Sequence, residues 1–283
     1  MPKFLLYYGQ LACAFLIWSS WLIPVRYLEI NSFSLSFLIC LWASFYWGCY
    51  CFFKYKNKIF LDYKKLKGLF LLAFFFILNM LTYLGALKYT TGAVAVLTHY
   101  TAPIFVAILA PIFLKERITK RIIIGLFLSI TGFVAIFYSK EGIKGESLIG
   151  AILGLSSGLF YAVIIIIAKK ILLKVNEEFL LFYQNVFSFI IFLPFLPFIN
   201  LNLNIKTFLY LGILSFIYSV VASKLYINAL KKVEGIRASI IGYLEPLGTI
   251  IWGFIFFQEN ITIKTIIGGI FILFSGYLVT TKE

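Results

Sequence analysis

The sequence predicts an all-α integral membrane protein with ten transmembrane helices in two inverted five-helix repeats. Its composition, its long apolar segments and an internal repeat are the three observations behind this prediction. The chain has 283 residues, of which 62% are hydrophobic and 13% are charged. Soluble domains are about half apolar and about one quarter charged, so this composition is typical of a membrane protein.

The charged residues separate apolar segments that are each long enough to cross a bilayer. A spanning helix needs about 20 mostly apolar residues. The ten candidate spans are 4–25, 33–53, 67–87, 91–114, 121–139, 147–168, 178–199, 206–230, 235–257 and 263–281. Backbone groups in lipid must hydrogen-bond within their own segment, which makes each span a helix.

The distribution of Lys and Arg predicts the orientation of these spans. With the N-terminus in the cytoplasm, the inner segments carry 18 Lys and Arg residues and the outer segments carry six. This positive-inside bias places both termini in the cytoplasm of a multi-pass cell-membrane protein. The same short loops account for the net charge of +14. The lipid bilayer is therefore the expected macromolecular environment, and we expect no nucleic-acid partner.

The chain repeats itself after 143 residues. Residues 83–125 align without a gap on residues 226–268, and 17 of these 43 positions are identical. We place the first repeat at 1–140 and the second at 141–283. Five spans per repeat is an odd number, so the halves cross the membrane in opposite senses. Inverted repeats around a site at the membrane midplane are typical of secondary transporters.

Segments of both repeats resemble the drug/metabolite transporter superfamily, in its EamA-type branch. The similar segments are APIFVAILAPIFLKERIT, LEPLGTIIWGFIFFQENIT and the tryptophan-bearing FLIWSSWLIP. The resemblance rests on Pro103 with Glu116 and on Pro246 with Glu259, each Glu lying 13 residues after its Pro. It implies ten helices, alternating access and a central cavity lined largely by spans one, three, four, six, eight and nine. His99 and Lys224 depart from the usual apolar pattern.

His99 and Glu245 are the main candidates for a substrate site. At 1.5 Å per residue, each lies roughly 13–15 Å deep in an apolar core about 30 Å thick. A carboxylate facing lipid is costly, so Glu245 should face protein or a water-filled cavity. We expect Glu245 to carry the coupling proton. The alternative for both residues is a structural pair that fixes helix packing.

Lys224 decides between two cavity chemistries. If Lys224 pairs with Glu245, the cavity is near neutral and suits a zwitterion or a polar metabolite. If Lys224 instead extends to the cytoplasmic interface, which we favour, the cavity keeps one negative charge beside aromatic rings and suits a cation.

Further candidates lie on repeat-related or proline-bearing segments. The expected substrate-binding residues in addition to His99 and Glu245 are Trp18, Asn79, Tyr83, Tyr100, Tyr161, Tyr226 and Tyr243. For each of them the alternative role is packing or interhelical hydrogen bonding. Pro103 and Pro246 are expected to break their helices.

These observations favour a secondary transporter for a small organic solute, preferably an amine or an amino-acid-like metabolite, coupled to protons. The alternatives are a flippase or exchanger for lipids or nucleoside-type metabolites and, less favoured, a membrane-embedded enzyme. The sequence shows no nucleophile–base constellation and no phosphate-binding loop, so we expect no enzyme, no cofactor and no metal. A monomer or a homodimer is expected. The direction of transport, import or metabolite export, stays open.

Overall fold

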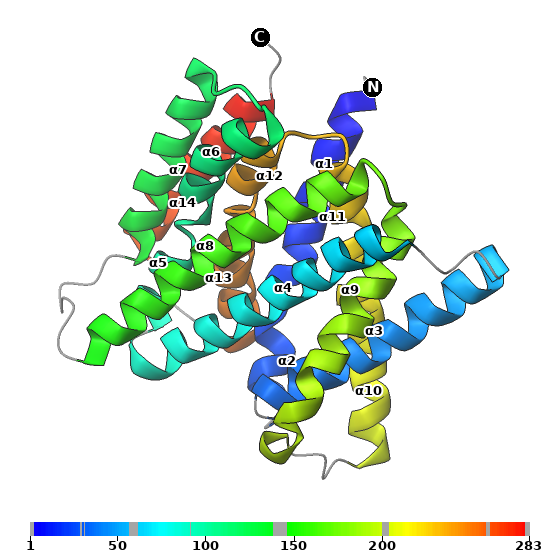
Figure 1. Cartoon of the computed structure of the whole chain (residues 1–283). Coiled ribbons are helices and arrows are strands. Elements are labelled where there is room, and N and C mark those ends of the chain that lie inside the picture. The colour runs from blue at the N-terminus through cyan, green and yellow to red at the C-terminus, as the bar shows by residue number, and fades with distance from the viewer. Residues whose placement is uncertain are drawn as a thin grey trace.

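The computed structural model describes residues 3–28, 30, 32–56, 62–90, 92–137, 146–199, 204–258 and 261–280, and every regular element in these ranges is a helix. The first half contains α1 (Lys3–Ser19), α2 (Leu22–Tyr27), α3 (Ser32–Tyr55), α4 (Tyr63–Tyr89), α5 (Gly92–His99), α6 (Ala102–Leu114) and α7 (Lys120–Phe137). The second half contains α8 (Glu146–Leu172), α9 (Glu177–Phe192), η2 (Leu193–Phe198), α10 (Ile205–Ser215), η3 (Phe216–Ala222), α11 (Ser223–Leu230), α12 (Gly235–Ile241), α13 (Leu244–Phe257) and α14 (Ile263–Thr280). In Figure 1, α1 begins and α14 ends at the same end of the bundle, which we call the termini end.

The helices confirm the predicted membrane fold. Within the described ranges, nine segments are long and apolar enough to cross a membrane. They are α1–α2, α3, α4, α5–α6, α8, α9–η2, α10–η3–α11, α12–α13 and α14. The fifth predicted span is α7, an apolar helix of 18 residues that packs along α14. The chain is therefore a multi-pass membrane protein with five crossing segments in each half.

The 143-residue repeat of the sequence recurs in the structure. Lys115 and Gln258 lie 143 residues apart and end α6 and α13 in the same left-handed conformation, with φ of 57° and 55°. Tyr100 and Tyr243 are also repeat mates, and they meet where the halves face each other. The Tyr243 hydroxyl donates a hydrogen bond of 2.8 Å to the Tyr100 carbonyl.

Helices α7 and α14 are repeat mates that pack closely through small residues. Ser275 Oγ donates to the Gly125 carbonyl oxygen over 2.7 Å. The symmetry-related contact joins Gly268 and Gly132, where a Cβ on Gly132 would lie 2.5 Å from the Gly268 carbonyl oxygen. Only a residue without a side chain permits this backbone approach.

Replacing Gly268 by Ala should therefore destabilise the protein. The new Cβ would meet the Gly132 backbone oxygen and the Ile136 side chain, so α7 and α14 must move apart. Overpacking of this kind costs about 1–3 kcal/mol. Gly276→Ala is the matched control on the same helix, because a Cβ there meets nothing within 4 Å. Thermal unfolding in detergent measures both variants. Equal stability of the two variants would contradict the close packing.

Three of the predicted spans are broken rather than continuous helices. Turns at Ser20–Trp21, Tyr100–Thr101 and Gly242–Tyr243 divide the first, fourth and ninth spans. Pro103 and Pro246 lie in the first turns of α6 and α13. Backbone N–H groups in a first turn have no acceptor within the helix, so a proline there removes no helical hydrogen bond. Both breaks therefore fall just before the prolines, within the spans.

The eighth span contains a π-helical segment, η3, which the sequence pattern did not predict. Such segments leave backbone carbonyls free for other donors. Trp18 Nε1 donates to the Tyr218 carbonyl over 3.1 Å, and Trp47 Nε1 donates to the Ser219 carbonyl over 3.0 Å. Two indoles from α1 and α3 thereby fix η3 beside the centre of the bundle.

Candidate functional site

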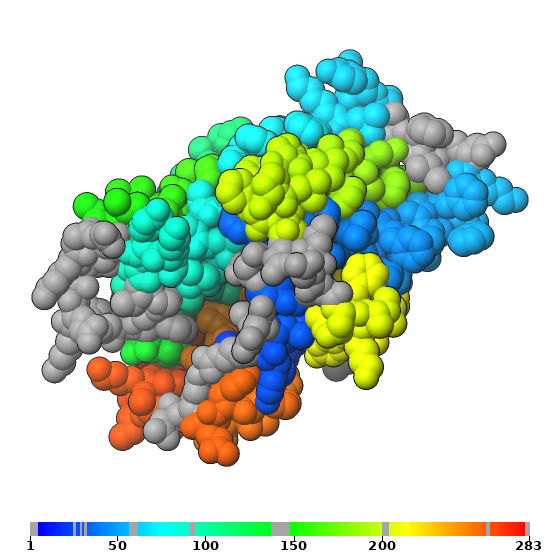
Figure 2. Space-filling model, turned by 90° about the horizontal axis from the view of Figure 1, so that it is seen from below, coloured from blue at the N-terminus to red at the C-terminus, as the bar shows by residue number. Residues whose placement is uncertain are grey.

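Two adjoining cavities lie between the halves of the molecule. The larger, of about 520 Å³, lies toward the end opposite the termini and is called the vestibule; the smaller, of about 390 Å³, is called the central cavity. Their shared wall residues are Trp18, Trp21, Met80, Tyr83, Tyr100 and Glu245. Figure 2 looks onto the end opposite the termini and shows the surface hollowed among blue, teal and orange-brown segments.

The vestibule and the central cavity are lined by the spans that the resemblance implied, with two additions. Spans one, three, four, six, eight and nine all contribute side chains. The second span adds Leu35 and Ser36 to the vestibule, and the seventh adds Leu181 and Gln184 to the central cavity.

Glu245 lies at the junction of the two cavities, in the first turn of α13. A carboxylate at this position is favoured by the positive end of the helix dipole. Tyr100 lines the same junction. None of the ion pairs in the described part of the chain involves Glu245. Glu245 is also the one acidic residue among the described side chains that line either cavity, and no Lys or Arg is among them.

His99 belongs to a hydrogen-bonded row on the wall of the central cavity. Its Nδ1 lies 2.7 Å from Ser157 Oγ, and Asn79 Nδ2 donates to the same Ser157 Oγ over 3.0 Å and to its carbonyl over 2.8 Å. With Asn79 as a donor, the Ser157 hydrogen is left for His99 Nδ1. A neutral His99 then carries its own hydrogen on Nε2.

Glycines of α8 make this row possible. A Cβ on Gly158 would lie 2.6 Å from the His99 carbonyl oxygen, and a Cβ on Gly154 would overlap Thr98. The two glycines let α8 approach the broken fourth span closely, which brings Ser157 to His99. These two glycines, four residues apart on α8, thus pack against α5 and the turn that follows it.

Aromatic rings surround Glu245 and His99. The His99 ring centroid lies 4.7 Å from that of Tyr83, 5.1 Å from that of Tyr100 and 5.6 Å from that of Tyr161. Across the central cavity, the Trp18 and Tyr226 centroids are 5.2 Å apart, and Phe15 packs edge-on against both. A solute in this space would contact ring faces and edges on most sides.

Most of the residues expected to bind substrate lie on these walls. The structure brings together Trp18, Asn79, Tyr83, His99, Tyr100, Tyr161, Tyr226 and Glu245, with Pro103 and Pro246 beside them. Tyr243 is placed differently. It is only 1% exposed, is not among the lining residues, and packs behind Tyr100, to which its hydroxyl donates. Its position is that of a support for Tyr100.

Several lining residues were not expected. Phe15, Trp21, Phe76, Met80 and Thr249 line the cavities but lie in uniformly apolar surroundings that carry no signal in the sequence. Gln184, which stands next to Asn185 within the seventh span, is a further lining residue. The structure turns Gln184 to the central cavity, whereas Asn185 Nδ2 donates to the Leu181 carbonyl of its own helix.

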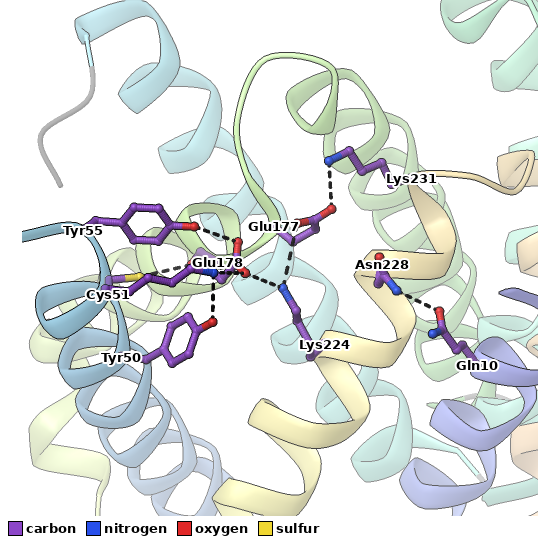
Figure 3. Close-up of polar contacts among 10 residues, drawn as sticks. Gln10, Tyr50, Cys51, Tyr55, Glu177, Glu178, Lys224, Asn228 and Lys231 are labelled. Carbon is purple, nitrogen blue, oxygen red and sulfur yellow. Dashed lines mark hydrogen bonds and ion pairs between the residues drawn. The ribbon is translucent and has the colours of Figure 1, made fainter. Parts of the chain in front are cut away.

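Lys224 does not pair with Glu245. Its ammonium extends toward the termini end and lies 2.8 Å from Glu178 Oε1 and 3.8 Å from Glu177 Oε2. Lys54 lies 3.2 Å from the same Glu178 oxygen, and Lys231 lies 2.8 Å from Glu177 Oε1. Figure 3 shows this network joining α3, α9 and α11.

Two further sets of polar contacts lie at the termini end. Asn228 Nδ2 of α11 donates to Gln10 Oε1 of α1 over 3.0 Å, also visible in Figure 3. Glu116 accepts hydrogen bonds from the Gly235 and Ile236 backbone N–H groups, at 2.7 and 3.1 Å, and lies 3.1 Å from Lys169 Nζ. Glu116 thus caps α12 and pairs with Lys169. Its repeat mate Glu259 lies outside the described residues.

Comparisons with known proteins agree with this two-half membrane architecture. A sequence model described as the EamA-like transporter family matches residues 5–138 and again 148–281. An uncharacterized transporter of Archaeoglobus fulgidus is 32% identical over 204 residues, 70% of each chain. One of Clostridium kluyveri is 28% identical over 206 residues, covering 68% of this chain and 65% of its own length.

A solved crystal structure shares the fold. It has 15% sequence identity and a TM-score of 0.79, and the match covers 97% of this chain and 98% of that one. The two sequence matches lie 143 residues apart, which is the spacing of the internal repeat. On the strength of these matches, this chain belongs to the EamA-like transporter family.

Proposed function

We propose that this protein is a secondary transporter that moves a small organic amine across the cell membrane by alternating access, in exchange for a proton carried by Glu245. The observation that carries the proposal is the position of Glu245. Its carboxyl lies where the vestibule meets the central cavity, among aromatic side chains, and none of the described lining residues is a Lys or Arg.

The charges and rings of the cavity favour a cation as solute. Lys224 pairs with Glu178, so it leaves the charge of Glu245 uncompensated. Ring faces such as those of Tyr83, Tyr161 and Trp18 attract ammonium groups that have lost part of their water. An amino acid is the second candidate. Its ammonium would meet Glu245, but its carboxylate would find only neutral donors such as the Gln184 side chain.

Competition between matched solutes tests the solute class. The purified protein first binds a labelled amine. Three unlabelled competitors are then added separately: a primary amine, the amino acid with the same carbon skeleton, and the corresponding carboxylate. We expect the amine to compete best, the amino acid less well and the carboxylate not at all. Preferential binding of the carboxylate, or of a sugar phosphate, would overturn the proposal.

The orientation is proposed from the charge bias. One set of segments carries 18 Lys and Arg residues and the other six, which supports a cytoplasmic location for the termini end. The vestibule then opens to the outside, and the network around Glu178 closes the cytoplasmic side.

Cysteine labelling checks this orientation. In a background in which the four native cysteines are replaced by Ser, Arg117→Cys at the termini end should react with a membrane-impermeant thiol reagent only after the membrane is opened. Lys264→Cys at the opposite end should react in intact cells. Both positions are exposed in the structure. Reversal of the two labelling patterns would refute the orientation.

A further inference from the structure

A third cavity, separate from the vestibule and the central cavity, lies on the outer surface of the helix bundle. It has a volume of about 800 Å³ and is formed by α4, α6 and α8. Figure 1 shows α4 and α8 side by side, and the two helices make extensive contacts. We call it the lateral groove. Because α4 belongs to one half and α8 to the other, the groove lies along the seam between the two halves.

The floor and walls of the lateral groove are apolar. Leu71 and Phe75 come from α4, Leu109 from α6, and Leu159 and Val163 from α8. These residues belong to membrane-spanning segments, so the groove faces hydrocarbon. Leu71 remains 44% exposed within it. A depression of this kind in a membrane must be filled by lipid chains or by another apolar partner, because a void forfeits dispersion contacts.

One end of the groove is basic, and this identifies the occupant. The groove's lysines, Lys64, Lys65, Lys170 and Lys174, all lie at its termini end. Asp62 neutralises Lys65, with 2.9 Å between Asp62 Oδ2 and Lys65 Nζ. The other three form no ion pair within the described part of the chain.

Lys170 shows how the basic end meets the apolar part. Its ammonium lies 4.8 Å from the centroid of the Phe113 ring, at the mouth of the groove. Positive charge thus stands directly beside apolar surface, which matches the charged headgroup and apolar acyl chains of an anionic phospholipid. A zwitterionic lipid balances its phosphate with its own cation and would bring no net counter-charge to the three ammonium groups.

We propose that the lateral groove binds an anionic phospholipid, with its acyl chain along α4 and α8 and its phosphate among Lys64, Lys170 and Lys174. Basic pockets between transmembrane helices recognise such headgroups. The bound lipid contacts both halves of the transporter at their seam, so it should stabilise the described conformation. This site is distinct from the solute cavity, and the proposal does not depend on the nature of the solute.

The test measures retention and stabilisation by defined lipids. Delipidated protein in detergent receives phosphatidylglycerol or phosphatidylcholine with identical acyl chains, and native mass spectrometry and thermal unfolding follow binding. We expect phosphatidylglycerol to be retained and to raise the melting temperature, and phosphatidylcholine to do neither. Inorganic phosphate and glycerol phosphate should have no effect, because the groove binds the acyl chain. Equal effects of both lipids, or of phosphate alone, would overturn the proposal.

Two variants examine the two parts of the site separately. The triple variant Lys64→Gln/Lys170→Gln/Lys174→Gln should bind phosphatidylglycerol on the order of 100-fold more weakly, at about five-fold per lysine. Its matched control, Lys115→Gln/Lys120→Gln/Lys232→Gln, removes three exposed lysines of the same end that do not line the groove. Gly68→Phe keeps all lysines but fills the groove, and it should also lose the lipid. Equal loss in the control triple, or full retention by folded Gly68→Phe, would contradict the assignment.

Discussion

Glu245→Gln should abolish transport driven by a pH gradient while leaving the protein folded. Glutamine keeps the shape of the side chain but can neither release a proton nor hold a negative charge. The described residues provide no second carboxylate on the cavity walls to replace it. Because Glu245 has no ion-pair partner among the described residues, the substitution leaves no other buried charge there uncompensated, so the fold should survive.

Solute binding by the same variant should also weaken. A hydrogen bond to a charged group contributes about 1.5–3 kcal/mol, so amine affinity should fall roughly ten- to 150-fold. In the proposed mechanism, protons compete with the amine for the Glu245 carboxylate of the wild type. Amine affinity should therefore decrease as pH falls, and this dependence should disappear in Glu245→Gln.

Uptake into proteoliposomes with an imposed pH gradient and equilibrium binding across a pH series provide the two measurements. Glu245→Asp, which keeps an ionisable group on a shorter side chain, should retain pH-dependent binding at reduced affinity. Gradient-driven transport by Glu245→Gln at the wild-type rate would show that another group carries the proton.

The architecture was predictable because it depends on features that can be read directly from the sequence, namely repeat spacing and the length of apolar segments. A fixed spacing of 143 residues indicated the two halves, and it reappears in the matching left-handed ends at Lys115 and Gln258. Apolar length predicted the spans, and the desolvation cost of a charge predicted that Glu245 would face a cavity. These inferences need only local composition and the physics of the bilayer.

The parts that could not be predicted depend on how helices rotate and pair. Repeat symmetry alone makes Tyr100 and Tyr243 equivalent, yet only Tyr100 lines the central cavity. The two residues meet at the seam between the halves, where Tyr243 packs behind Tyr100. Spans that are apolar all round do not show which face turns inward, so Phe76 and Met80 gave no signal. The partner of Lys224 lies 46 residues away on another helix.

Joining Gln10 to Asn228 should stop transport without preventing solute binding from the vestibule. The two side chains share a hydrogen bond of 3.0 Å between α1 and α11, two helices that pack directly against each other. The proposed alternating access requires the termini end to open. In the described conformation that end is closed by this contact and by the ion pairs of Glu178 with Lys54 and Lys224.

The experiment places Gln10→Cys and Asn228→Cys together in the background without native cysteines and forms the cross-link by oxidation. Oxidised protein should lose uptake in proteoliposomes, and a reducing agent should restore it. Amine binding in detergent should remain, because the cross-link lies at the termini end. The vestibule, through which the amine reaches Glu245, opens toward the opposite end. Each single-cysteine variant, treated with the same oxidant, serves as the control. If the oxidised pair transports as fast as the reduced pair, α1 and α11 do not separate during transport, and the solute must leave the central cavity by another path.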